Sequence, residues 1–253
     1  MLAAERRKII IEQLQSEKKV VTSQLSALFN VSDETIRRDL DRLCQDGLAI
    51  KSHGGAIINE EGSELPYKVR KMHKPNEKKI IAELVETLVQ DNESIMLDAS
   101  TTAVFITKML KKKKGLTVIT NSVEVIVESA DMSDWTVIAP GGRVIGDYLA
   151  ITGQQVIESL ADYQVDKAIF SCKGLDIERG IFDGNDIFAQ VKRRMLKSAK
   201  TKILAADLGK FGRPALSKIG DFGCVDMIIT DARPNDRWLE VFEQHEVNCL
   251  FGI

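Results

Sequence analysis

Residues 32–43, SDETIRRDLDRL, place an apolar residue at every third or fourth position. At about 100° per residue, three apolar side chains fall on one narrow side of a helix, and Arg38 falls almost opposite them. The apolar side consists of Ile36, Leu40 and Leu43. Ser32 is a good N-cap, and Gly47 suits the C-terminal exit. The pattern therefore predicts an amphipathic helix from Ser32 to about Gln45.

Two further helices are predicted before this one. Residues 5–15 carry apolar residues at helical spacing, and residues 22–29 repeat the pattern behind Thr22, which suits an N-cap. Asn30 and Val31 break the second helix from the third. Two short helices joined by a tight turn, after a first helix, are typical of a helix-turn-helix.

The polar side of the third helix is suited to DNA. Arginine forks match guanine edges and phosphates, and threonine can reach a base or a phosphate. The candidate DNA contacts on this helix are Ser32, Thr35, Arg37, Arg38 and Arg42. The alternative is a solvated face with Arg–Asp pairs, which would be favoured for an isolated helix. The helix before it and the hairpin after it favour the interpretation that this face binds DNA.

That hairpin is predicted over residues 48–58, LAIKSHGGAII. Two β-rich runs flank Gly54 and Gly55, and paired glycines suit a tight turn. A hairpin behind a recognition helix can act as a wing on the DNA backbone. Its polar candidates are Lys51, Ser52 and His53.

Residues 60–75 have the composition of a linker. Residues 60–63, EEGS, suit a loop, and residues 68–75, KVRKMHKP, are basic and end at a proline that disfavours helix just before it. We interpret the cations as solvated. The predicted organisation is a winged helix-turn-helix over 1–59, a linker with some helix over 60–75, and a second domain over 76–253.

From residue 76 onward, helical and strand patterns alternate. Asn76 is predicted to cap a helix that extends through about Gln90, and another helix is predicted over 186–199. Strands are predicted at 94–98, 116–120, 135–139, 167–171, 202–207 and 227–231, with a weaker one at 247–251. The alternation predicts an α/β domain with a largely parallel sheet.

Polar loops follow four of these strands, at residues 98–102, 120–122, 141–143 and 207–212. The carboxyl ends of strands in an open α/β sheet converge on one crevice, and helix N-termini there bind anions. Each loop alone is explained by a helix cap, a turn or a surface charge. Together they predict a ligand site, whose candidate residues are Asp98, Ser100, Thr101, Thr102, Asn121, Gly141, Gly142, Arg143 and Lys210.

The sequence of the first domain resembles that of the DeoR family of bacterial regulators. The resemblance in the first domain is carried by Arg6, Ile10 and Leu14, by residues 32–40, SDETIRRDL, and by residues 53–56, HGGA. It implies a winged helix-turn-helix with residues 32–46 as recognition helix. It also implies repression at operator DNA.

The later loops resemble the sensor domain of the same family, whose fold is similar to ribose-5-phosphate isomerase and coenzyme A transferases. The resemblance implies that Ser100, Thr101 and Thr102 hold the phosphate of a phosphorylated sugar. It implies that Asp98, Asn121 and Lys210 contact the sugar. The chain departs from the family where Ser100 replaces a frequent glycine and where Phe188 replaces a glutamate before Ala189, and these departures bear on which sugar fits.

The composition argues against a zinc protein, a disulfide-stabilised protein and a membrane-spanning protein. The chain has 253 residues, 44% of them apolar, and a net charge of −2. Four cysteines without a C-x-x-C pair, and three histidines, argue against a zinc site or a disulfide framework. Apolar runs fall far short of the roughly 20 residues of a membrane span. We expect a cytoplasmic protein with no metal, no cofactor and no membrane partner.

Two functions remain open at this point. The first is a ligand-controlled DNA-binding repressor, expected to be a homo-oligomer (a dimer or tetramer) because most helix-turn-helix proteins dock as symmetric dimers. The second is a sugar-phosphate isomerase-like enzyme fused to a DNA-binding module. That chemistry needs a general base and an oxyanion stabiliser. Asp98, Asp207 and Lys210 could in principle supply these, but no convincing second carboxylate lies at a matching loop. A non-enzyme is therefore expected.

Overall fold

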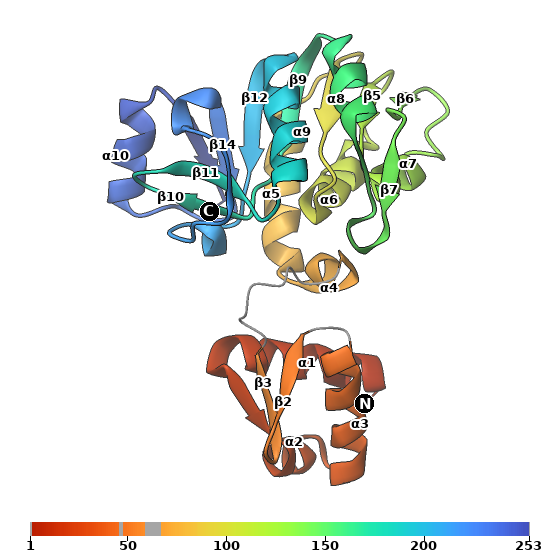
Figure 1. Ribbon diagram of the computed structural model, residues 1–253, viewed down its shortest axis with the longest axis vertical. Coiled ribbons are helices and arrows are strands. Elements are labelled where there is room, and N and C mark those ends of the chain that lie inside the picture. Colours follow the sequence, from red (N-terminus) through yellow and green to blue (C-terminus); the bar gives the residue numbers. More distant parts are fainter. Residues whose placement is uncertain (1, 46–47, 59–66, 253) are drawn as a thin grey trace. The chain divides into compact units, whose positions relative to one another are not determined.

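The computed structural model describes residues 2–45, 48–58 and 67–252 (Figure 1). The chain forms two compact units that divide between Met72 and His73, inside the predicted linker. Each unit has its own sheet and its own apolar core.

The N-terminal unit combines helices with a three-stranded antiparallel sheet of order β1-β3-β2. Its helices are α1 (Ala3–Glu17), α2 (Thr22–Phe29), α3 (Asp33–Gln45) and α4 (Tyr67–Met72). Its strands are β1 (Lys19–Val21), β2 (Ala49–Ser52) and β3 (Gly55–Ile58). The order of α2, α3 and the β2–β3 hairpin confirms the predicted winged helix-turn-helix (Figure 1).

The apolar stripe of α3 is buried, as predicted. Ile36, Leu40 and Leu43 lie in one cluster with residues of α1 and α2, among them Ile10 and Leu25. Burying an aliphatic side chain of this size contributes about 1.5–3 kcal/mol. The stripe therefore fixes α3 with its opposite side toward solvent.

The boundaries of this unit differ from the prediction in three places. Strand β1, three residues between the first two predicted helices, is not among the predicted elements. Val21 rather than Thr22 is the N-cap of α2. The turn falls at residues 53–54, and Gly55 begins β3, where a Cβ would lie 2.0 Å from the carbonyl oxygen of Val20. Gly47, the predicted exit of α3, lies outside the described residues.

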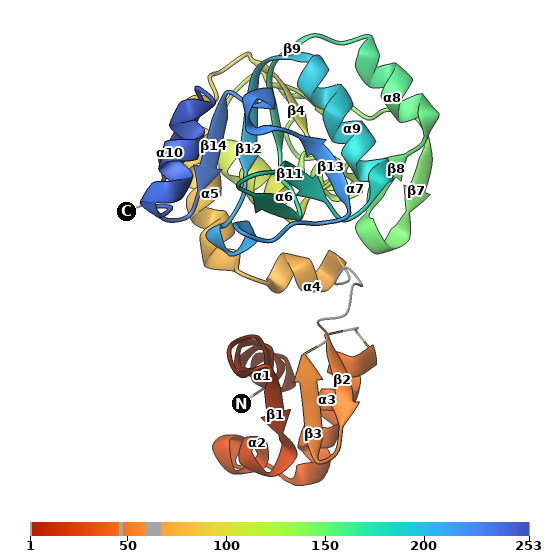
Figure 2. The same ribbon diagram turned by 60° about the vertical axis from the view of Figure 1, so that its left-hand side comes forward.

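The C-terminal unit contains a seven-stranded parallel sheet (Figure 2). In spatial order its strands are β15 (Asn248–Phe251), β14 (Met227–Thr230), β12 (Ala199–Ala205), β9 (Val165–Phe170), β4 (Ser94–Leu97), β5 (Thr117–Thr120) and β6 (Thr136–Ile138). All seven correspond to predicted strands, which confirms the α/β fold class.

The helices of this unit are α5 (Pro75–Leu88), α6 (Thr101–Leu110), α7 (Val123–Glu128), α8 (Gln154–Ala161), α9 (Asp186–Lys197) and α10 (Asp236–Gln244). From β4 the chain proceeds through β5 to β6 at one edge, and from β9 it proceeds through β12 to β15 at the other. Right-handed crossovers therefore put the connecting helices on opposite faces. In agreement, α6 contacts α5 and α7, whereas α9 contacts α8 (Figure 2).

Where these two directions meet, β4 lies beside β9. A reversal of this kind leaves a crevice beyond the carboxyl ends of the strands, because the two connections leave toward opposite faces. The pair β4–β9 is called the switch point below. Asp98 follows β4 and Ser171 follows β9.

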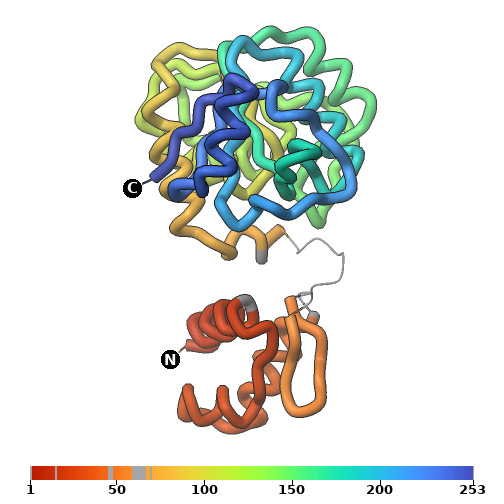
Figure 3. The backbone as a smooth tube through the Cα atoms, turned by 90° about the vertical axis from the view of Figure 1, so that its left-hand side faces the viewer, coloured from red at the N-terminus to blue at the C-terminus, as the bar shows by residue number. Residues whose placement is uncertain are grey.

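Short antiparallel elements, not predicted from the sequence, surround the sheet. They are the hairpin β7 (Arg143–Ile145) and β8 (Ala150–Thr152) and a sheet of β10 (Gly174–Asp176), β11 (Gly180–Asp183) and β13 (Ser217–Gly220). The unit also has three 3-10 turns, η1 (Gly146–Tyr148), η2 (Leu208–Lys210) and η3 (Phe222–Cys224). Figure 3 traces the chain through them from α5 to the blue C-terminal strand.

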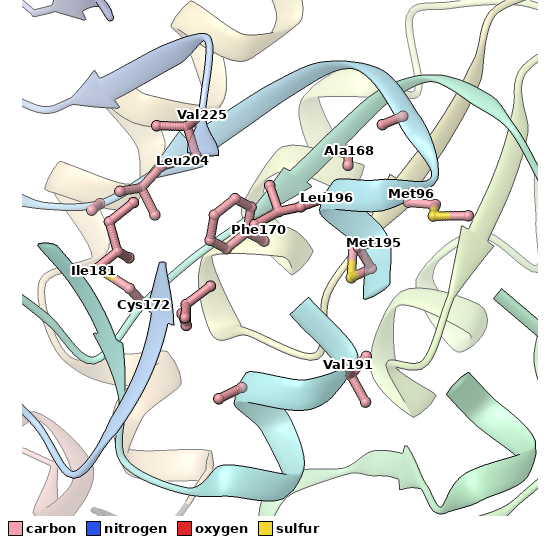
Figure 4. Packing of buried hydrophobic residues seen from close by; sticks show 14 of the residues in the cluster. Met96, Ala168, Phe170, Cys172, Ile181, Val191, Met195, Leu196, Leu204 and Val225 are labelled. Carbon is pink, nitrogen blue, oxygen red and sulfur yellow. The ribbon is translucent and has the colours of Figure 1, made fainter. Parts of the chain in front are cut away.

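One core cluster of this unit includes the face of α9 with Val191, Met195 and Leu196. Phe170 of β9 lies beside Leu196, and Leu204 of β12 lies near Val225 and Ile181 in the same cluster (Figure 4). This packing fixes the face of α9 that is turned toward the sheet.

Two helix boundaries differ from the prediction. Helix α5 begins at Pro75 with Lys74 as its N-cap, not at Asn76, and it ends at Leu88 rather than Gln90. Proline suits this first position because its missing N–H would have no partner there. Helix α9 ends at Lys197 because Ala199 already begins β12.

Candidate functional site

The predicted DNA contacts lie on the solvent side of α3. Ser32 accepts a hydrogen bond from the backbone N–H of Thr35 at 3.3 Å, and the two hydroxyls lie 2.9 Å apart. Ser32 is thus the N-cap, as predicted. Arg37, Arg38 and Arg42 are exposed.

The cations of this surface make weak or exposed ion pairs. Arg38 pairs with Glu34 one turn earlier at 3.4 Å, with the Arg38 side chain 79% exposed. Lys51 of β2 pairs with Asp41 of α3 at 2.7 Å. The hydrogen bond that Lys51 donates to the Asp41 carboxylate raises the pKa of Lys51. Exposed pairs of this kind contribute little, so a DNA phosphate or base can replace the carboxylate.

Directly behind this surface lies a buried ion pair. Asp39 accepts from Arg6 of α1 at 2.5 Å and from Arg7 at 3.1 Å, and the side chains of Arg6 and Asp39 are both buried. Asp39 therefore ties α3 to α1 and does not face solvent. His53, by contrast, lies exposed in the turn of the hairpin.

The switch point holds a buried charged cluster. The carboxylate of Asp98 accepts from the backbone N–H of Ser171 at 3.2 Å and lies 3.3 Å from the ammonium of Lys192 on α9. Lys192 also donates to Asp183 at the end of β11. Burial alone would lower the pKa of Lys192, but Asp183 and Asp98 outweigh it and the pKa is raised. Lys192 is therefore a fixed cation between two carboxylates.

Lys210 approaches the same point from η2. Its ammonium donates to the hydroxyl of Ser171 at 2.7 Å and lies 3.9 Å from the carboxylate of Asp207. Ser171 in turn donates to the carbonyl of Ala205 at 2.6 Å. The structure thus joins two predicted site residues, Asp98 and Lys210, through Ser171.

The hydroxyl run after β4 starts α6. Ser100 accepts from the backbone N–H of Ala103 at 3.1 Å and is the N-cap of this helix, while its own N–H donates to Asp98 at 3.3 Å. Thr101 and Thr102 are both buried. Ser100 therefore caps α6, as one of the two interpretations of this loop expected. The first turn of α6 begins beside the switch point.

Asn121 follows β5 and is buried. Its side-chain N–H group donates to the carbonyl of Ile151 at 3.0 Å, but its side-chain oxygen is buried without a hydrogen-bond partner. A buried acceptor without a partner is unfavourable by about 1–3 kcal/mol. The oxygen is therefore suited to a hydroxyl donor from a ligand.

In the loop of residues 141–143, close packing accounts for the glycine at position 142. Gly142 has φ +148°, and a Cβ there would lie 2.6 Å from the carbonyl oxygen of Thr152. Gly141 and Arg143 are exposed. Among the residues that the structure describes, the side chain of Arg143 makes no hydrogen bond or ion pair with the switch-point cluster, so this loop is not joined to the others.

Sequence reasoning missed Lys192, Asp183 and Ser171. Lys192 had a usable signal, because it lies in phase with Ala189 and Leu196 on the buried face of α9. A lysine at that position is almost never buried unless it is paired. Phe188, one turn earlier, packs on Tyr148 with ring centroids 4.6 Å apart.

Two family models match the chain. The DeoR-like helix-turn-helix domain matches residues 6–62, and the DeoR C terminal sensor domain matches residues 73–232. The chain belongs to the DeoR family. It is accordingly a DNA-binding transcription regulator with a sensor domain.

Relatives of this DeoR-family protein match along nearly the whole chain. It is 36% identical to the uncharacterized HTH-type transcriptional regulator YulB of Bacillus subtilis (strain 168), over 98% of this chain and 96% of that protein. It is 32% identical to the HTH-type transcriptional repressor GlcR of the same strain, over 99% and 96%. It is 27% identical to the glycerol-3-phosphate regulon repressor of Escherichia coli (strain K12), over 98% of both.

Solved structures resemble this DeoR-family chain in fold. The tetrameric eIF2B-beta2-delta2 complex from C. thermophilum matches 96% of this chain and 88% of that chain, with a TM-score of 0.50 and 15% identity. A D-ribose-5-phosphate isomerase matches 53% of this chain and 52% of that chain, with a TM-score of 0.40 and 16% identity. In the described parts of the chain, no helix is both long and apolar enough to cross a membrane.

Proposed function

We propose that this protein represses a sugar-metabolism operon and that a phosphorylated sugar controls its binding to operator DNA. The proposal is carried by an ammonium at the switch point, where Ser171 joins Lys210 to Asp98, and by a buried acceptor on Asn121 after the neighbouring strand β5. A sugar phosphate has an anionic group for the first and hydroxyl donors for the second. The named repressors among the relatives support this class of function.

The phosphate is proposed to bind at the first turn of α6. Backbone N–H groups of Thr101 and Thr102 point out of the helix N-terminus, which favours an anion. Lys210 would add a full positive charge. Sugar hydroxyls would meet Asp98 and Asn121. Gly141, Gly142 and Arg143 remain weaker candidates, because the packing around Gly142 already explains that loop.

DNA is proposed to meet the exposed side of α3. Arg37, Arg38 and Arg42 would enter the major groove, with Ser32 and Thr35 at the helix N-terminus near the backbone. Lys51 and His53 of the hairpin would reach phosphates. A symmetric homo-oligomer, a dimer or a tetramer, would place two such surfaces on repeated half-sites.

The ion pairs of the switch point argue against catalysis. A general base needs a free carboxylate within reach of the substrate. Asp98 and Asp183 are both committed to Lys192. We therefore propose a binding role and no reaction.

One experiment tests this function. A DNA site is first selected from a random duplex library with the full-length protein. Its release is then measured with ribose 5-phosphate, glucose 6-phosphate, fructose 6-phosphate, glycerol 3-phosphate and inorganic phosphate, and each compound is checked for turnover. We expect release by at least one sugar phosphate, little release by inorganic phosphate, and unchanged compound. No release by any sugar phosphate, or turnover, would overturn the proposal.

A further inference from the structure

Lys74 lies where the C-terminal unit begins, between α4 and α5. It is the N-cap of α5 and has a left-handed backbone with φ 48°. For a residue with a side chain, this conformation is unfavourable by about 1–2 kcal/mol. Something must stabilise it.

An ion pair supplies that stabilisation. The ammonium of Lys74 donates to Asp207 at 2.5 Å, with the Lys74 side chain 28% exposed and the Asp207 side chain 9% exposed. Residues 74 and 207 are far apart in sequence, so the contact fixes the start of α5 onto the turn that carries Lys210. Gly209 lies directly beneath it, because a Cβ there would be 1.8 Å from the Lys74 nitrogen.

Two cations share the carboxylate of Asp207. Lys74 is bonded to one oxygen, and Lys210 lies 3.9 Å from the other. Burial by itself would raise the pKa of Asp207, but the charges of Lys210 and Lys74 lower it. A change in the position of either ammonium therefore changes how strongly Asp207 holds the other.

The contacts continue without a break to the candidate ligand site. Lys210 donates to Ser171, and the backbone N–H of Ser171 donates to Asp98. Asp98 meets Lys192. Each contact is an ion pair or a hydrogen bond with at least one charged or buried partner. The path ends at Lys74, two residues after the boundary of the DNA-binding unit.

We propose that the Lys74–Asp207 ion pair couples the ligand site to DNA binding. The inference rests on the proposed function. An anionic ligand that draws Lys210 away leaves Asp207 with Lys74 as its partner, so the pair tightens and holds Lys74 in its left-handed conformation. That conformation of Lys74 is then unequally populated with and without ligand, which is the requirement for a ligand to change DNA affinity.

The test measures coupling, not binding alone. For each variant, the Kd for the selected DNA is measured without ligand and with saturating ribose 5-phosphate, glucose 6-phosphate, fructose 6-phosphate or glycerol 3-phosphate. We expect Lys74→Met to reduce the ratio of the two Kd values at least about fivefold, within the usual range of coupling between sites. The Kd for DNA without ligand should stay within about threefold of wild type, because Lys74 lies outside both proposed binding surfaces.

Two further variants sharpen this result. Lys79→Met removes a lysine of the same helix that is exposed and pairs with Glu83, and it should leave the ratio unchanged. Gly209→Ala keeps every charge but displaces the Lys74 ammonium, and it should reduce the ratio as Lys74→Met does. It also decides the matter if Lys74→Met fails to fold.

The outcomes separate the two proposals. A wild-type protein that no sugar phosphate releases would overturn the proposed function, and this inference with it. A wild-type response that persists unchanged in both Lys74→Met and Gly209→Ala would overturn the coupling alone. A purely structural role for Lys74 would lower the thermal stability and leave the ratio intact.

Discussion

The exposed side of α3 and the switch point of the parallel sheet hold their cations in opposite ways. Arg38 and Lys51 stand in solvent with single, exposed carboxylate partners. Lys192 is buried between Asp98 and Asp183, and Lys210 is held by Ser171. A polyanion such as DNA is met by cations that exchange partners at little cost. A small ligand is met by groups whose positions are already fixed. The predictions below test this contrast.

The largest effect is expected at Lys192. Lys192→Met leaves two buried carboxylates without their cation, so we expect a loss of about 3–5 kcal/mol in the free energy of unfolding of the C-terminal unit. Urea denaturation of the variant measures it. The matched control is Lys197→Met, which replaces an exposed lysine on the same helix. This variant should change the free energy of unfolding by less than about 0.5 kcal/mol. Equal losses in the two variants would contradict the assigned burial.

A smaller and different effect is expected at Arg38. Its side chain is exposed and contributes no apolar contact, so Arg38→Ala should leave the fold intact. Loss of a good bidentate base contact weakens specific DNA binding by about 1–3 kcal/mol. Fluorescence anisotropy with the selected site and with scrambled DNA measures both affinity and base preference. Retention of both would remove Arg38 from DNA readout.

The smallest effect is expected at His73, which lies between the two extremes of burial. Burial, and after it the charges of Lys78 and Lys74, lowers the pKa of His73 to about 4, below its ordinary value of 6.5. Between these values the unfolded chain binds more protons than the folded one, so stability falls as pH drops from 6.5 toward 4 and is fully present above 6.5.

We therefore expect wild type to lose on the order of 1 kcal/mol more than His73→Gln between pH 7 and pH 5, after discounting for the partial exposure of the ring. Urea denaturation at both pH values measures the difference. The same pH slope in both proteins would show that His73 is not held neutral by its surroundings.

The sequence carries most of the fold because its longer elements have clear periodicity. The stripe of Ile36, Leu40 and Leu43 and the seven parallel strands are each long enough, or apolar enough, to identify. Strands β7, β8, β10, β11 and β13 have three or four residues, and β13 pairs with β11 from a distant part of the chain, which no local pattern reveals.

Some residues of the candidate site could likewise be predicted from the sequence, and others could not. Asp98, Asn121 and Lys210 could be placed because they follow strands that share one edge. Ser171 also follows such a strand, but a single hydroxyl has too little specificity to select it. Asp183 is the last residue of β11, which belongs to another sheet, and the pairing of Lys74 with Asp207 spans most of the C-terminal unit. These residues meet only through tertiary packing.

In the proposed function, a sugar phosphate bound at Lys210 controls the binding of DNA by the helix-turn-helix. Wild type and Lys210→Ala, each bound to the selected DNA, are titrated with the sugar phosphate that best releases wild type, while anisotropy reports release. We expect the two proteins to bind DNA equally without ligand, and the variant to need at least a tenfold higher ligand concentration for release. A charge-assisted hydrogen bond contributes about 1.5–3 kcal/mol, and about 1.4 kcal/mol corresponds to a tenfold change in affinity. Release of both proteins at the same ligand concentration would contradict binding at Lys210.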